Sequence, residues 1–76
     1  MILPPEKYPF GLKMEMAISE VEYRVKSMAG LKWERNDVNT ITIYDVPFEI
    51  RRLCDLICKF RLDGNLYDIY YYEVSS

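Results

Sequence analysis

The sequence contains no histidine, and this absence excludes several kinds of site at once. Most zinc sites, the usual serine and cysteine triads and the commonest general base depend on an imidazole. The three glycines, Gly11, Gly30 and Gly64, stand alone, so no glycine-rich phosphate-binding loop is expected. The carboxylates are scattered, without a pair placed for acid–base chemistry. The sequence therefore predicts no enzyme, no cofactor and no metal site.

Cysteines and long apolar runs are also scarce. Cys54 and Cys58 are too few to staple a secreted mini-protein. No apolar stretch approaches the ~20 residues that would span a bilayer. The first residues lack the basic start and apolar run of a signal peptide. We expect a cytoplasmic protein with reduced thiols, without a membrane partner and without an evident small-molecule substrate.

The composition is that of a small globular domain. Half of the 76 residues are apolar and 29% are charged. The net charge of −2 disfavours a protein that coats nucleic-acid duplexes by neutralising phosphates. Pro4, Pro5 and Pro9 predict an irregular N-terminal arm over residues 1–11. The remaining residues, 12–76, are expected to form one α+β domain.

Local patterns predict the elements of this domain. Residues 12–18 alternate apolar and polar side chains, which indicates a strand, and Ser19 with Glu22 resembles a capping box that starts a helix over residues 20–29. Residues 31–35 and 40–46 read as a hairpin, and residues 65–74 as a final strand. A second helix is expected over residues 47–62, where Ile50, Leu53 and Ile57 share one helical face.

This order of elements predicts a fold class. A β-α-β-β-α-β order gives a two-layer sandwich of the ferredoxin-like kind, with a four-stranded antiparallel sheet and both helices on one face. If residues 12–18 instead belong to a longer helix, the order becomes α-β-β-α-β with a three-stranded sheet. Both alternatives place helices on one face of the sheet only.

The tyrosines are the most informative feature for function. In the last strand Tyr70 and Tyr72 point away from the face that carries Tyr71, and Tyr44 of the hairpin joins them. Tyrosine is enriched at recognition surfaces. We therefore expect a small non-catalytic binding module of the regulator, antitoxin or virus-encoded inhibitor type. It would act by stoichiometric contact with a protein partner or a second copy of itself, with Trp33 as a candidate anchor beside these tyrosines.

Two other interpretations of the tyrosine face compete with this one. The arm over residues 1–11 could fold back and cover the face with its own apolar side chains. Alternatively, the tyrosines could stack on the bases of single-stranded RNA, with Arg51, Arg52 and Lys59 on the predicted helix as an electrostatic docking strip. The acidic net charge counts against RNA, and the strip also fits an ordinary solvated helix face.

Overall fold

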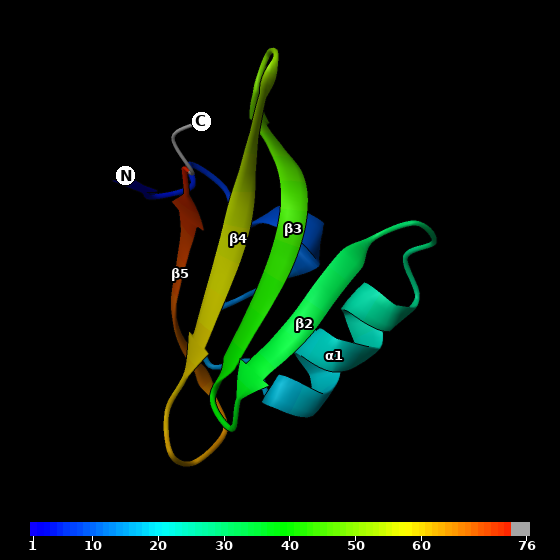
Figure 1. Ribbon diagram of the computed structural model, residues 1–76. Helices are drawn as coiled ribbons and strands as arrows, with labels where there is room; N and C mark the ends of the chain where they lie inside the picture. The colour runs from blue at the N-terminus through cyan, green and yellow to red at the C-terminus, as the bar shows by residue number, and fades with distance from the viewer. Residues whose placement is uncertain (74–76) are drawn as a thin grey trace.

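The computed structural model describes residues 1–73 and is built on a five-stranded antiparallel sheet with one short α-helix (Figure 1). The strands lie in the order β1-β5-β4-β3-β2. Four of them follow one another along the chain as a meander, and β1 joins it at the far edge. The elements are β1 (Ile2–Leu3), a 3-10 turn η1 (Pro9–Gly11), α1 (Ile18–Lys26), β2 (Lys32–Asp37), β3 (Thr40–Glu49), β4 (Arg52–Phe60) and β5 (Leu66–Tyr72).

The predicted ferredoxin-like sandwich is wrong, and so is the three-stranded alternative, because residues 47–62 do not form a helix. The chain continues β3 to Glu49, turns at Ile50 and Arg51, and returns as β4. Every second residue of β4 from Cys54 onward is buried. The same apolar residues fit both a helical face and a strand, and pairing with β3 on one side and β5 on the other selects the strand.

The expected strand over residues 12–18 is also absent. This segment runs beneath the sheet, where Leu12 and Met16 enter the core, and it exchanges two backbone hydrogen bonds of 2.8 Å with Leu66. The helix predicted over residues 20–29 is confirmed as α1, which buries Val21 and Val25 against the sheet. It begins after Ala17 without a side-chain cap, so the predicted capping box does not form.

The predicted hairpin and final strand are confirmed with small changes of boundary. Lys32–Asp37 pairs with β3, and β5 pairs with both β4 and β1. Gly30 lies in the connection between α1 and β2 with φ of +80°, a left-handed conformation that glycine adopts without strain. Residues 74–76, which include the end of the predicted final strand, lie outside the described residues.

Within residues 1–73, the segments that cover the sheet lie on one of its faces. Between β1 at one edge and β2 at the other, the chain crosses that face through η1 and α1 (Figure 1). The core forms between the crossing segment and the sheet. Its buried apolar residues are Leu12, Met16, Val21, Val25, Ile41, Ile43, Val46, Cys54, Leu56, Cys58, Phe60, Leu66, Ile69 and Tyr71.

The N-terminal arm does not cover the opposite face. Its β1 extends the sheet beside β5, with Ile2 opposite Tyr72 and Leu3 opposite Tyr71. Leu3 and Phe10 pack against the core, on the same side of the sheet as α1. The alternative in which the arm hides the tyrosines is therefore not realised.

Candidate functional site

The sheet face turned away from α1 carries no second layer within residues 1–73, and we call it the outer face. Strand alternation and register assign its residues, because the neighbours of each core residue along a strand point to the other side. It comprises Ile2, Lys32, Glu34, Asn36, Thr40, Thr42, Tyr44, Pro47, Leu53, Asp55, Ile57, Lys59, Asp68, Tyr70 and Tyr72.

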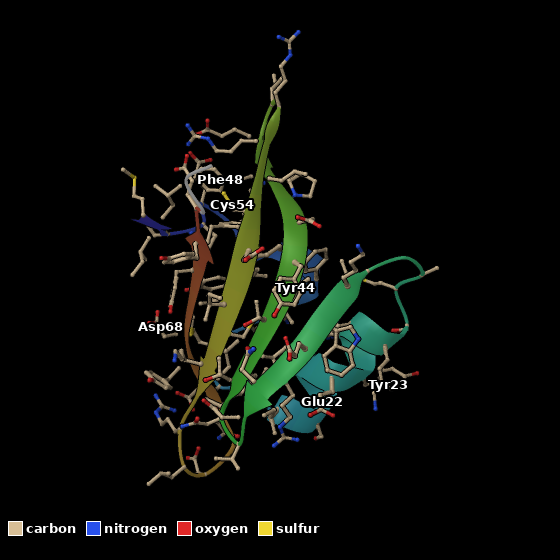
Figure 2. The ribbon with its side chains drawn as sticks, in the orientation of Figure 1. Glu22, Tyr23, Tyr44, Phe48, Cys54 and Asp68 are labelled. Carbon is tan, nitrogen blue, oxygen red and sulfur yellow. The ribbon has the colours of Figure 1, made fainter. Side chains whose placement is uncertain are left out.

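The outer face brings together the three tyrosines that the sequence singled out. Tyr70 lies opposite Ile57, which lies opposite Thr42, so these residues form one row across three strands. Tyr72 lies in the next row, opposite Asp55 on one side and Ile2 on the other. Figure 2 shows Tyr44 on this face, whereas Tyr23 projects from α1. Tyr72 and Ile2 are 45% and 61% exposed, which leaves apolar area available to another molecule.

Tyr44 is held in place by an acidic neighbour. Its hydroxyl donates a hydrogen bond to the Glu34 carboxylate on the adjacent strand β2. This bond raises the pKa of Tyr44 above its usual value, and the Asp55 carboxylate adds a smaller effect in the same direction. The ring is thus fixed at one side of the outer face, with its phenol protonated at neutral pH.

Trp33 does not join the tyrosines. It lies opposite Ile43 in β3, and Ile43 is a fully buried core residue, so the indole points to the α1 side of the sheet. There it packs, partly buried, against the core. The sequence suggested an anchor near the hairpin edge, but the strand register separates Trp33 from Tyr44 by the thickness of the sheet.

The three candidate docking cations do not form a strip. Arg51 occupies the β3–β4 turn, where its φ is +66°. Arg52 lies 3.8 Å from Glu49 and 3.6 Å from Glu73, measured from Nη1 to the nearest carboxylate oxygen. Lys59 lies on the outer face, with its Nζ 3.5 Å from the Thr40 hydroxyl oxygen. The helix that would have aligned these residues does not exist, so a continuous basic surface is not formed.

The charged residues at the centre of the outer face form no ion pairs with other described residues. Among residues 1–73, none of the ion pairs includes Asp55, Lys59 or Asp68. These side chains flank the apolar row that contains Ile57 and Tyr70. The centre of the face therefore combines aromatic surface with charges of both signs.

Sequence reasoning missed three apolar members of this face. Leu53 and Ile57 were assigned to a helical core, and Ile2 to an irregular arm. In the structure Leu53 is 60% exposed opposite Pro47, and Ile57 is half-buried between Thr42 and Tyr70. For Leu53 and Ile57 the available signal is the alternation of Cys54, Leu56, Cys58 and Phe60, which places the odd-numbered residues of this strand on the other side.

The two cysteines belong to the core. Both are free and buried, and burial raises the pKa of the Cys58 thiol to about 12. They are four positions apart on one strand, which corresponds to ~13 Å and is too far for one metal ion to bind both. Over residues 1–73 no group of three metal-ligating side chains is close enough to hold a metal.

Comparisons with known proteins identify no relative from which a function could be transferred. Within the described part of the chain, no helix has the length and apolar character needed to cross a membrane. The chain matches no protein-family model, no curated protein and no solved structure.

Proposed function

We propose that this protein is a non-catalytic binding module that acts by stoichiometric contact with a protein through its outer face. The observation that carries the proposal is the one-sided cover of the sheet: α1 and the crossing segment lie on one face (Figure 1), while Tyr44, Tyr70 and Tyr72 occupy the other. Tyrosines beside exposed aliphatic side chains are the usual anchors of protein interfaces. A regulator, an antitoxin or an inhibitor would act in this way.

The charge of the outer face favours a protein over a nucleic acid. Glu34, Asp55 and Asp68 outnumber Lys32 and Lys59, so the face offers little to a phosphate backbone. The phenol of Tyr44 is already engaged by a carboxylate. We place the module in the cytoplasm, since its two cysteines are free thiols.

A photo-crosslinking experiment tests the proposal. The photoreactive amino acid p-benzoylphenylalanine replaces Tyr72 on the outer face, or Tyr23 on α1 as the control, because both side chains are exposed and lie on different sides of the sheet. Irradiation in cells of the source organism should give one discrete protein adduct from position 72 and none from position 23. Adducts to RNA, or equal adducts from both positions, would refute the proposal.

A further inference from the structure

The charges of the outer face follow a pattern that is complementary to itself. On β4, Asp55, Ile57 and Lys59 point to this face in the order acidic, apolar, basic. On β5, Asp68, Tyr70 and Tyr72 follow as acidic, aromatic, aromatic. The register joins the two strands so that Ile57 lies opposite Tyr70, with Asp55 opposite Tyr72 and Lys59 opposite Asp68. The Ile57–Tyr70 row therefore lies between a row that holds Asp55 and Tyr72 and a row that holds Lys59 and Asp68.

A two-fold axis that runs across the strands, parallel to the sheet and just above the Ile57–Tyr70 row of the outer face, satisfies both patterns together. It places Asp55 over Lys59 of a second copy, and Lys59 over Asp55 of that copy. It also places the Tyr72 hydroxyl over the Asp68 carboxylate, while Ile57 and Tyr70 meet their own counterparts on the axis. An interface of two identical patches must have this kind of self-complementarity.

Within the described part of the chain, the absence of ion pairs at these charges, of which only Lys59 has a hydrogen-bond partner in the Thr40 hydroxyl, supports the same arrangement. Asp55, Lys59 and Asp68 take part in none of the ion pairs within residues 1–73, so each is available to an external partner. In this arrangement Glu34 would face Glu34 of the second copy. Glu34 lies on β2, however, two strands from β4, and two packed sheets that are both twisted diverge there, which keeps the two carboxylates apart.

We infer that the partner of the outer face is a second copy of this chain, packed sheet against sheet about this axis. This inference rests on the proposed function and names the occupant of the same face. Strands β2 to β5, ~4.8 Å apart and over about six residues each, give a footprint on the order of 380 Å². That is below the ~800 Å² per partner of a standard interface, so the dimer should be weak and reversible.

The test is sedimentation equilibrium of the purified full chain over a range from about 1 µM to about 1 mM. Wild-type protein should pass from monomer to dimer within this range. Asp55→Lys and Lys59→Asp should each weaken dimerisation by about tenfold or more, because like charges then face each other. An equimolar mixture of the two variants should restore a heterodimer, since all charges become complementary again. Glu6→Lys, the same charge change on the exposed arm, is the control and should leave the dimer unchanged.

Each outcome decides the inference. A chain that stays monomeric, or a dimer that neither charge variant weakens, overturns it, and so does a mixture of folded variants that fails to associate. If a charge variant does not fold, as judged by circular dichroism, Tyr70→Ala removes a ring from the axis and should weaken the dimer instead. A monomeric protein that still crosslinks another protein from position 72 would refute this partner while leaving the proposed function standing.

Discussion

Two adjacent residues of β4, Leu56 and Ile57, lie on opposite faces of the sheet. Leu56 is fully buried on the α1 side, whereas Ile57 is half-buried on the other side. Leu56→Ala should lower the free energy of unfolding by about 2–5 kcal/mol because it leaves a cavity. Ile57→Ala should lower it by about 1 kcal/mol. Urea denaturation of both variants measures the difference, and equal losses would contradict the assignment of Ile57 to the outer face.

A second residue-scale prediction concerns the buried thiol of Cys58. Its pKa is about 12 in the folded protein, compared with 9.0 for an ordinary thiol. The unfolded chain therefore loses this proton first, and stability should fall between pH 9 and pH 12 by about 1.4 kcal/mol per pH unit. Below pH 9 the thiol has no effect, because it is protonated in both states.

The matched variant for this prediction is Cys58→Val, which fills the same space without an ionisable group. Lysines and tyrosines also titrate in this range, so the measured quantity is the difference between the two proteins. Denaturant unfolding at several pH values should give a less steep decline for the variant. Parallel curves would show that the Cys58 thiol does not experience the burial that the structure assigns to it.

Among the elements, local signals were sufficient for α1, the β2–β3 hairpin and β5. Val21 and Val25 recur at helical spacing, and a stretch rich in Asn and Asp over residues 36–39 marks the turn between the two hairpin strands. They were insufficient for β4, where apolar residues stand at both odd and even positions. Leu53 and Ile57 are apolar residues of the outer face, and together with the core residues of β4 they form the apolar spacing of a helical face. The apolar residues on the outer face of β4 therefore hid the two-residue alternation that would have identified it as a strand.

A substitution in the turn between β3 and β4 tests whether residues 47–62 form a hairpin and not a helix. Arg51 has φ of +66°, a conformation that glycine adopts without strain. Arg51→Gly should therefore raise the free energy of unfolding by about 0.5–1 kcal/mol, whereas in a helix it would lower it by a similar amount. Ile50→Gly, at the neighbouring turn position without a positive φ, is the control and should not stabilise. Thermal unfolding of the two variants measures the sign.

At the scale of the whole molecule, the sequence predicted the tyrosine face better than the fold that carries it. Tyr70 and Tyr72 alternate with core residues along one strand, and this alternation holds whatever covers the other side. Trp33 could not be placed, because its side of the sheet depends on the register with β3. The arrangement of Arg51, Arg52 and Lys59 depended on a helix that tertiary pairing replaces with a hairpin.

The same scale gives a prediction for β1, which protects the edge of β5. Deleting residues 1–3 removes its pairing with Tyr71 and Tyr72 and the bond from the Glu73 amide to the Met1 carbonyl. Stability should fall by on the order of 1 kcal/mol, and the β5 amides should exchange faster with solvent while those between β3 and β4 stay protected. Hydrogen exchange measures this, with Ile2→Thr as a control that keeps the backbone pairing. Unchanged exchange rates of the β5 amides after the deletion would show that β1 does not protect the edge of β5.

The position of β1 also sets an order of folding events. Strands β2 to β5 follow one another through short connections, so their pairing closes only small loops. Ile2 and Tyr72, by contrast, meet about 70 positions apart in the chain, and closing so large a loop has a higher entropic cost. The meander can therefore assemble first and capture the crossing segment beneath it. The two-residue strand β1 would then be the last strand to pair during folding and the first to detach during unfolding.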